Sequence, residues 1–348
     1  MLWATDDIRI DAIKPLIPPA ILMEELPLTD GASELIALTR QQITACLRGT
    51  DPRLVCIAGP CSIHDPDAAL EYATRLKKQA DRLADDLLIV MRVYFEKPRT
   101  SVGWKGLIND PFIDGSFAIN KGLRIARKLL LDVAAAGLPA GCEYLDTIMP
   151  QFLADLVSWG AIGARTTESQ IHRELASGLS CPIGFKNATN GNIQVAIDAI
   201  EAARHPHHFL SVTKQGVAAI VATRGNDACH MILRGGSQGP NDDAETLRDT
   251  TTKLRTQGLP HRIMVDCSHG NSLKDHTCQP AVAARVAEKL AGGDRSIFGV
   301  MLESHLLAGR QEALAGKPLV YGQSITDACM GWEETVRVLE TLATAARR

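Results

Sequence analysis

The sequence has no excess of charge of either sign. Its 348 residues include 37 Lys plus Arg and 40 Asp plus Glu, a formal net charge of −3 at pH 7. Proteins that bind nucleic acid usually carry a basic surplus, so this near balance excludes nucleic-acid binding as the first interpretation. Hydrophobic residues make up 45% of the chain and charged residues 22%, which is ordinary for a globular protein with a large buried core.

The sequence also lacks a disulfide framework, a leader and a membrane span. Its nine cysteines form no CxxC pair, and an odd number cannot all pair within one chain. No basic and apolar leader opens the sequence. No apolar run approaches the roughly 20 residues that a membrane-spanning helix needs. These absences predict a cytoplasmic protein, with no membrane part, whose thiols are buried or reactive.

Repeats and flexible linkers are absent too, and only the first part of the chain stands apart. Residues 1–52 contain four prolines within the first 27 positions, followed by a polar amphipathic stretch over 33–47. We expect an amino-terminal arm and one helix there, with a role in regulation or oligomer assembly. Residues 53–348 are then expected to form one catalytic barrel.

Short apolar runs recur after residue 53, and most are followed by a helical pattern. The predicted strands are 54–58, 87–93, 140–144, 162–165, 183–186, 208–212, 218–223, 230–234, 263–266 and 299–303. Ten strands are two too many for an eight-stranded barrel. However, only five residues separate the sixth and seventh runs, and Gly216 lies among them, which predicts a hairpin.

The remaining eight strands alternate with helices, which predicts parallel pairing. Eight such units predict an α/β fold of the (β/α)8, or TIM, barrel type, with the hairpin inserted at about 207–224. An open, doubly wound sheet is the alternative fold.

Charged residues cluster where the predicted strands end, which is the edge of a barrel that carries the active site. Six cations that come from five strand ends are Arg92, Lys97, Arg99, Arg165, Lys186 and Arg234. Together they predict a cleft that holds carboxylate or phosphate groups. The turn over 234–236 could add backbone N–H donors for an anion. The alternatives are surface ion pairs and, for Lys186, a Schiff-base lysine.

A mixed set of potential metal ligands also falls at or beyond strand ends. Cys61, His269, Glu303 and the downstream Asp327 offer one thiolate, one imidazole and two carboxylates, a set that suits a divalent first-row metal. Only the barrel would bring them together. Each also has a structural interpretation: a buried thiol, a hydrogen-bonded core histidine, an ion-pair partner and the N-cap of the last helix, respectively.

Six longer strings resemble a known family. They are 59–65 (GPCSIHD), 91–100 (MRVYFEKPRT), 160–170 (GAIGARTTESQ), 184–187 (GFKN), 233–236 (LRGG) and 322–327 (GQSITD). The chain resembles the class I 3-deoxy-D-arabino-heptulosonate 7-phosphate (DAHP) synthases over nearly its whole length. The resemblance implies the first step of the shikimate pathway, a metal-dependent condensation of phosphoenolpyruvate, erythrose 4-phosphate and water to DAHP and phosphate.

The resemblance also implies roles for individual residues. For phosphoenolpyruvate it implies Arg92, Lys97, Arg165, Lys186 and Arg234. For erythrose 4-phosphate it implies Lys97, Pro98, Arg99, Thr100 and Asp327. For one divalent ion (Mn, Fe, Co or Zn) it implies Cys61, His269, Glu303 and Asp327. Lys97 would donate a proton, and Glu143 and Lys186 would handle the water.

Feedback inhibition by an aromatic amino acid is implied as well. The residues that resemble the effector pocket are Pro150, Gln151, Leu175, Leu179, Ser180, Phe209, Ser211 and Val221. Asp6 and Asp7 from a neighbouring subunit would close it, which implies a homodimer or homotetramer. Ser211 resembles the phenylalanine-sensitive form, since tyrosine-sensitive relatives tend to have glycine there. The alternative is simple hydrophobic packing under the hairpin.

The chain departs from the family pattern at a few positions, of which Ala188, Ser237, Asp242 and Cys267 are the clearest. We expect none of them to touch a ligand, although Ser237 and Asp242 could weaken substrate-loop contacts or subunit packing. Two rival functions remain open at this point: an eight-carbon 3-deoxy-octulosonate phosphate synthase, and a silent barrel that only senses an aromatic amino acid.

Overall fold

Eight parallel strands close into a barrel in this computed structural model, which describes residues 3, 5–99, 102–313 and 317–347. The order around the barrel is β1-β10-β9-β8-β5-β4-β3-β2. Their bounds are β1 (Leu54–Gly59), β2 (Leu87–Arg92), β3 (Ala140–Glu143), β4 (Trp159–Ile162), β5 (Ile183–Lys186), β8 (Cys229–Leu233), β9 (Ile263–Asp266) and β10 (Ile297–Glu303). The predicted (β/α)8 fold is confirmed, and the open sheet is excluded.

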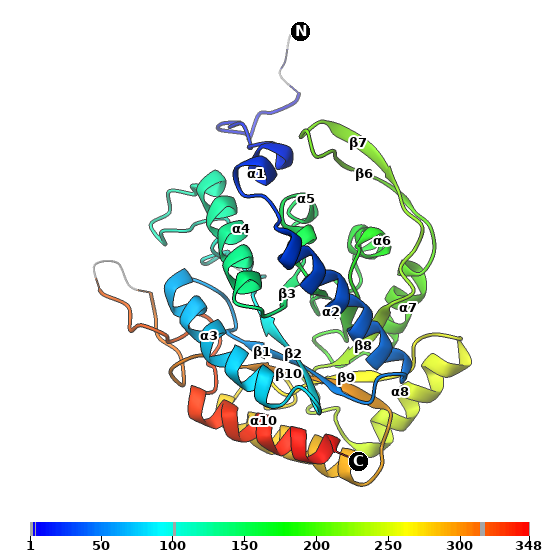
Figure 1. Cartoon of the computed structure of the whole chain (residues 1–348). Helices are drawn as coiled ribbons and strands as arrows, with labels where there is room; N and C mark the ends of the chain where they lie inside the picture. The colour runs from blue at the N-terminus through cyan, green and yellow to red at the C-terminus, as the bar shows by residue number, and fades with distance from the viewer. Residues whose placement is uncertain (1–2, 4, 100–101, 314–316, 348) are drawn as a thin grey trace.

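Helices follow the strands and cover the outside of the barrel (Figure 1). They are α3 (Pro66–Arg82), α4 (Ile119–Ala135), α5 (Pro150–Leu153) with η1 (Ala154–Leu156), α6 (Gln170–Gly178), α7 (Gln194–Ala203), α8 (Ala244–Thr256), η2 (His276–Cys278) with α9 (Gln279–Ala291), and α10 (Trp332–Ala346). None of the helices in the described ranges is both long and apolar enough to cross a bilayer.

One predicted strand was misplaced. The prediction put a strand at 162–165, whereas β4 ends at Ile162. Residues 163–167 instead form a turn in which the N–H groups of Thr166 and Thr167 donate to the Gly163 carbonyl. The buried Trp159 belongs to the strand because its ring fills the barrel interior.

Two helices precede the barrel, where one was predicted. They are α1 (Pro19–Glu25) and α2 (Asp30–Arg48). The side chain of Thr29 accepts the Ala32 N–H at the start of α2, and Gly49, at φ 80°, ends the helix in a left-handed conformation. Ile43, Cys46 and Leu47 pack against side chains inside the barrel, so α2 closes its amino-terminal end.

The alternation of strand side chains carries polar groups to the other end of the barrel. Since side chains along a strand alternate between faces, an interior residue is followed two positions later by another interior residue. Pairs of this kind are Val90 and Arg92, Ile232 and Arg234, Met264 and Asp266, and Met301 and Glu303. The apolar interior therefore ends in a charged layer at the carboxyl ends of the strands.

The predicted hairpin is present as β6 (His208–Val212) and β7 (Ala218–Ala222), an antiparallel pair that arches away from the barrel beside the arm (Figure 1). Its turn contacts the arm, since the Ala20 N–H donates to the Lys214 carbonyl over 2.7 Å. On the outer face, Leu210 is 85% exposed and Ile220 is 75% exposed. The hairpin therefore has one apolar face without a cover in the single chain.

Candidate active site

A cavity of about 470 Å³ opens at the carboxyl ends of the strands. All six predicted cations line it: Arg92, Lys97, Arg99, Arg165, Lys186 and Arg234. Lys274, His276 and Arg310 line it too. Sequence reasoning missed these three because they lie several residues beyond β9 and β10, on loops or at the start of η2, where no strand-end rule points to them. The predicted substrate residues Pro98 and Asp327 line the cavity as well, and Thr100 lies outside the described residues.

Arg92 is almost fully buried at the floor of the cavity. Its guanidinium donates to the carbonyls of Pro60 and Cys61 and to a carboxylate oxygen of Glu303, 3.0 Å away. It also lies over the ring of Tyr94, 3.5 Å from the centroid. Arg92 is therefore held in one orientation before any anion arrives.

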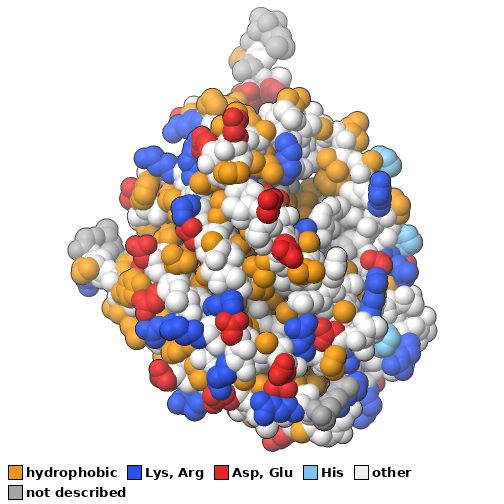
Figure 2. Space-filling model, in the orientation of Figure 1, with side chains coloured by type: hydrophobic (Ala, Val, Ile, Leu, Met, Phe, Trp, Pro, Cys, Tyr) orange, Lys and Arg blue, Asp and Glu red, His pale blue; other side chains and the backbone are white. Residues whose placement is uncertain are grey.

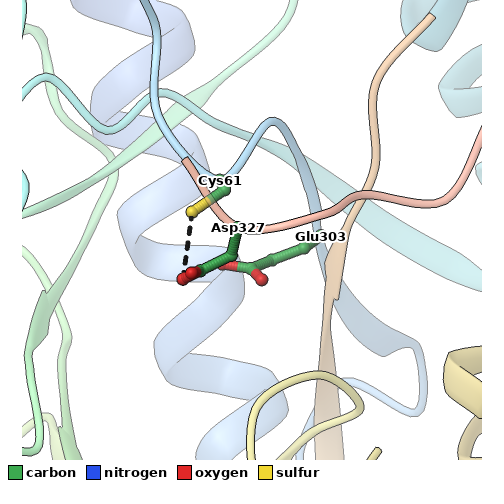
Figure 3. Close-up of side chains that lie close together, drawn as sticks. All are labelled: Cys61, Glu303 and Asp327. Carbon is green, nitrogen blue, oxygen red and sulfur yellow. Dashed lines mark hydrogen bonds between the residues drawn. The ribbon is translucent and has the colours of Figure 1, made fainter. Parts of the chain in front are cut away.

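Cys61, Glu303 and Asp327 lie together beside Arg92, although 242 positions separate the first two in the sequence and 24 the last two (Figure 3). One ligand atom from each falls within 4.8 Å of the others. The Cys61 thiol points at an Asp327 carboxylate oxygen 3.5 Å away. Burial raises the pKa of that thiol to about 11, and the Glu303 carboxylate adds to the effect.

Lys97 bridges this group. Its ammonium lies 2.8 Å from the Cys61 sulfur and 2.7 Å from an Asp327 oxygen. Burial alone would lower the pKa of Lys97, but Cys61 and Asp327 raise it above its ordinary value. For Asp327 the effects run the other way: burial would raise its pKa, yet Lys97 holds the pKa well below the usual range.

His269 lies slightly outside the group of three. Its Nε2 atom is 3.8 Å from Glu303 Oε1, and its Nδ1 atom is 2.9 Å from Asp266 Oδ2. With His269 the set offers sulfur, nitrogen and two carboxylates facing one another, which fits a divalent first-row metal. The alternative interpretation of Asp327, as the N-cap of the last helix, is excluded because Gly331 occupies that position in α10.

Lys186 is ion-paired with Asp266, which has no exposed surface, over 2.9 Å. Burial would raise the pKa of Asp266, but His269 and Lys186 hold it well below the ordinary value. A lysine held in an ion pair with a buried carboxylate matches the predicted contact with an anion better than a Schiff-base lysine, which must be neutral to react.

Glu143, at the end of β3, faces the same cavity. A Cβ atom on Gly163 would fall 2.1 Å from its Oε1 atom, so any other residue there would push this carboxylate out of its present position. The two outermost predicted cations make contacts to backbone carbonyls. Arg99 donates to the Trp104 carbonyl over 2.8 Å, and Arg165 approaches the Pro98 carbonyl at 3.5 Å.

The turn at 234–236 does not offer its backbone to an anion as predicted. The Gly235 N–H donates to Asn241 Oδ1 over 2.7 Å, and the Gly236 N–H donates to the Gly239 carbonyl. A Cβ on Gly235 would fall 2.4 Å from the backbone of Gly270, so the glycine is required by close packing of two loops. The Arg234 side chain, which lines the cavity, is the predicted anion contact that remains at this turn.

The departures from the family pattern have structural settings. Asp242 is buried and makes two hydrogen bonds to Arg285 of α9, at 2.9 and 3.0 Å. The Ser237 N–H donates to the Thr189 carbonyl over 3.0 Å. Both residues therefore tie the loop after β8 to neighbouring elements.

The residues predicted for the effector pocket come from three elements. Pro150 and Gln151 begin α5, and Leu175, Leu179 and Ser180 lie in α6 or directly after it. Phe209, Ser211 and Val221 share the inner face of the hairpin, where Phe209 pairs with Val221. Lys214 joins two of these elements, since its ammonium donates to the Gln151 carbonyl over 2.5 Å.

Asp6 and Asp7 lie in the arm, away from the barrel (Figure 1). Both are exposed, and within the described residues the Asp6 carboxylate accepts the Asp7 N–H. Figure 2 shows a hollow between the arm and the hairpin with apolar side chains in its wall. The elements that carry the predicted effector residues, α5, α6 and the hairpin, lie around this hollow (Figure 1).

Fold and site together define a (β/α)8-barrel enzyme with its active centre at the carboxyl ends of the strands. Within that class, the chain belongs to the DAHP synthetase I family, whose sequence model matches residues 34–340. It is an enzyme of the DAHP synthase class, which serves aromatic amino acid biosynthesis, as the sequence motifs predicted.

The chain is similar to named relatives along its whole length. It is 59% identical over 347 residues to the Phe-sensitive phospho-2-dehydro-3-deoxyheptonate aldolase of Escherichia coli K12, covering 100% of this chain and 99% of the relative. It is 55% identical over 346 residues to the tyrosine-inhibited enzyme of Schizosaccharomyces pombe, covering 98% and 93%. The solved phospho-2-dehydro-3-deoxyheptonate aldolase from Francisella tularensis SCHU S4 matches with a TM-score of 0.95 at 55% identity, covering 97% of this chain and 98% of that one.

Proposed function

We propose that the chain condenses phosphoenolpyruvate with erythrose 4-phosphate and water to give DAHP and inorganic phosphate, with one divalent metal ion. The observation that carries this proposal is the single cavity in which six cations meet beside a sulfur, nitrogen and carboxylate donor set. Two phosphates and one carboxylate together carry a charge of about −4 to −5, and the six cations of this cavity supply the complementary positive charge.

The residues divide between the two substrates. Arg92, Arg165, Lys186 and Arg234 hold phosphoenolpyruvate, together with Lys97. Arg99, Thr100 and Asp327 orient erythrose 4-phosphate. Because Arg92 is already fixed by Glu303 and Tyr94, it binds a carboxylate or phosphate without ordering a side chain first.

Cys61, His269, Glu303 and Asp327 would hold the metal as Mn²⁺, Fe²⁺, Co²⁺ or Zn²⁺. When bound, the ion supplies Lewis-acid polarisation of the aldehyde oxygen of erythrose 4-phosphate. Glu303 also contacts Arg92 directly, which joins this donor set to the proposed phosphoenolpyruvate site.

The chemistry forms one carbon–carbon bond. C3 of phosphoenolpyruvate attacks the aldehyde carbon, and Lys97 donates a proton to the oxygen as its negative charge develops. Water held by Glu143 and Lys186 adds to the cationic C2, with Glu143 accepting the proton. The C2–O bond to phosphate then breaks while the proton of the new C2 hydroxyl passes to the departing phosphate, which releases inorganic phosphate and leaves the keto group of DAHP.

Absorbance of phosphoenolpyruvate at ultraviolet wavelengths tests the reaction. We expect its loss with erythrose 4-phosphate present, no loss in excess chelator, and recovery when Mn²⁺ is restored. Absence of turnover with Mn²⁺ would refute the activity, and full turnover in chelator would refute the metal. Cys61→Ala should lower the bound-metal content, and unchanged content would remove Cys61 from the ligand set.

We further propose feedback inhibition by phenylalanine, bound by the inner face of the hairpin and by α5 and α6. Relatives named as Phe-sensitive, phenylalanine-inhibited and tyrosine-inhibited support an aromatic effector. The shared inner face of Phe209, Ser211 and Val221 offers an apolar wall with one hydroxyl. Activity measured against each of the three aromatic amino acids should single out phenylalanine, and insensitivity to all three would refute the pocket.

A second subunit would complete that pocket, so the arm and hairpin form a regulatory region separate from the catalytic barrel. Aliphatic side chains recur along the exposed arm at Ile8, Ile10, Ile13 and Leu16, and Leu210 and Ile220 face outward on the hairpin. Such a surface is normally covered by a partner. Leu210→Asp combined with Ile220→Asp should reduce the mass in light scattering and weaken phenylalanine inhibition. A monomeric wild type would contradict the shared pocket.

A further inference from the structure

Asp266 lies behind the active-site cavity with no exposed surface. Four hydrogen-bond donors meet its two carboxylate oxygens. Oδ2 is 2.9 Å from both Lys186 Nζ and His269 Nδ1. Oδ1 accepts the Ser268 N–H over 2.9 Å and the Ser268 hydroxyl over 2.6 Å. One oxygen therefore contacts both a predicted substrate lysine and a predicted metal ligand.

These contacts fix the tautomer of His269. The Ser268 hydroxyl uses its only hydrogen on Asp266, so its oxygen can only accept at the 2.6 Å contact with His269 Nδ1. Asp266 Oδ2 is an acceptor as well. The proton of the neutral ring must therefore lie on Nδ1, which leaves the Nε2 lone pair toward Glu303.

The backbone of His269 needs this support. Its φ angle is 55°, in the left-handed region that residues other than glycine seldom occupy. The Lys274 N–H donates to the His269 carbonyl over 2.7 Å, and the Gly270 N–H donates to the Arg234 carbonyl. Without Asp266, the ring would lose the contacts that set its direction at the end of this strained loop.

We propose that Asp266 is the positioning residue that joins the two halves of the active site. Through Oδ2 it sets the tautomer and direction of His269 for the metal and the position of Lys186 for phosphoenolpyruvate. The inference rests on the proposed function, because it assumes that His269 binds a metal and that Lys186 binds the substrate. Asp266 itself is not proposed to contact the metal or phosphoenolpyruvate.

Binding measurements without turnover test this proposal. Mn²⁺ binding to chelator-stripped protein is followed by electron paramagnetic resonance of free Mn²⁺, and phosphoenolpyruvate binding to metal-free protein by calorimetry. We expect Asp266→Asn to weaken Mn²⁺ binding 10- to 100-fold, the usual effect of losing a partner of a metal-bound histidine. The same variant should weaken phosphoenolpyruvate binding about tenfold.

Three further variants separate a positioning role from a general loss of structure. Lys186→Met should lose phosphoenolpyruvate binding while Mn²⁺ binds as tightly as in the wild type, or more tightly. Asp155→Asn removes another charged partner far from the site, the one paired with buried Arg127, and should lower thermal stability without changing either affinity. Ser268→Ala, which removes one contact to Oδ1 and one to Nδ1, should weaken Mn²⁺ binding in the same direction and serves if Asp266→Asn does not fold.

The outcomes discriminate between this inference and the proposed function. Wild-type protein that binds no Mn²⁺ would overturn the metal site itself. Wild-type protein that binds Mn²⁺, with a folded Asp266→Asn or Ser268→Ala variant that binds it within twofold as well, would overturn the positioning role alone. Loss of Mn²⁺ binding with phosphoenolpyruvate binding intact would overturn the link through Lys186.

Discussion

The ammonium nitrogen of Lys97 lies 2.8 Å from the thiol sulfur of Cys61. A positive charge at this distance stabilises a thiolate, yet burial and Glu303 dominate and raise the pKa of Cys61 to about 11. At neutral pH the thiol therefore keeps its proton. A metal ion that binds the sulfur must displace that proton, and the neighbouring Lys97 ammonium repels it.

Metal affinity should consequently rise with pH. The thiol must lose one proton on binding, so below its pKa the affinity of Mn²⁺ for the protein should increase about tenfold per pH unit between pH 7 and 8.5. Equilibrium titration of Mn²⁺ at several pH values measures the slope. Cys61→Ser, which offers no thiolate, should bind more weakly with a shallower slope, and an identical slope would contradict sulfur ligation.

Removal of the lysine should separate metal binding from turnover. In Lys97→Met the divalent ion no longer meets a fixed positive charge, so we expect tighter Mn²⁺ binding. The loss of a proton donor and a substrate contact should lower turnover by about 10²- to 10⁴-fold. Lys289→Met on α9, outside the site, is the matched control. Full turnover in Lys97→Met would exclude the donor role.

The free energy of unfolding should depend on pH because of the buried carboxyl group of Glu96. Its carboxylate accepts the N–H groups of Leu145 and Asp146, and burial, followed by repulsion from Asp146, raises its pKa to about 8. The folded state thus holds this proton more firmly than the unfolded state, in which the pKa is near 4.5. Its unfavourable contribution to folding is absent below about pH 4.5 and grows as the pH rises toward 8.

Glu96→Gln should remove that pH dependence. Relative to the variant, the wild type should lose on the order of a few kcal/mol between pH 5 and pH 8. Melting temperatures at both values give the comparison, with exposed Glu312→Gln as the control for the same chemical change. A constant difference between wild type and Glu96→Gln across the range would show that Glu96 ionises normally.

The buried ion pair of Arg127 with Asp155 should contribute more to folding stability than the exposed pair of Arg124 with Glu25. Arg127 has no exposed surface and donates to both carboxylate oxygens of Asp155 at 2.8 Å, and to the Leu26 and Phe152 carbonyls. Asp155→Asn leaves that charge without its partner, so we expect a loss of about 3–5 kcal/mol. Glu25→Gln breaks the exposed pair with Arg124 and should cost far less, because solvent screens that pair. Chemical denaturation of both variants tests the contrast.

Pattern alone predicted much of the fold. Alternating strands and helices predicted the barrel, and the short spacing around Gly216 predicted the hairpin, because both follow from local periodicity and turn chemistry. The error in the position predicted for the fourth strand has a physical reason. Trp159 and Gly160 lie in a strand because the indole packs inside the barrel, a contact that no local pattern records.

The candidate site was predictable where charged residues end strands, as at Arg92, Lys186, Arg234 and Glu303. Parallel strands place such residues at the same edge, so position along the chain was sufficient. Lys274 and Arg310 escaped prediction because loops decide which side chains reach the cavity. The expected anion site at 234–236 failed because the backbone donors are used by Asn241 and Gly239.

The sequence by itself therefore determined the barrel, the family and the identity of the chemical groups, since these depend on periodicity and on residue types at strand ends. Only the tertiary structure decided how those groups are coupled. Contacts such as Lys97 with Cys61, and Asp266 with Lys186 and His269, join residues from different strands and loops. Their distances and pKa values follow from burial and from neighbours far along the chain, which exist only once the barrel has closed.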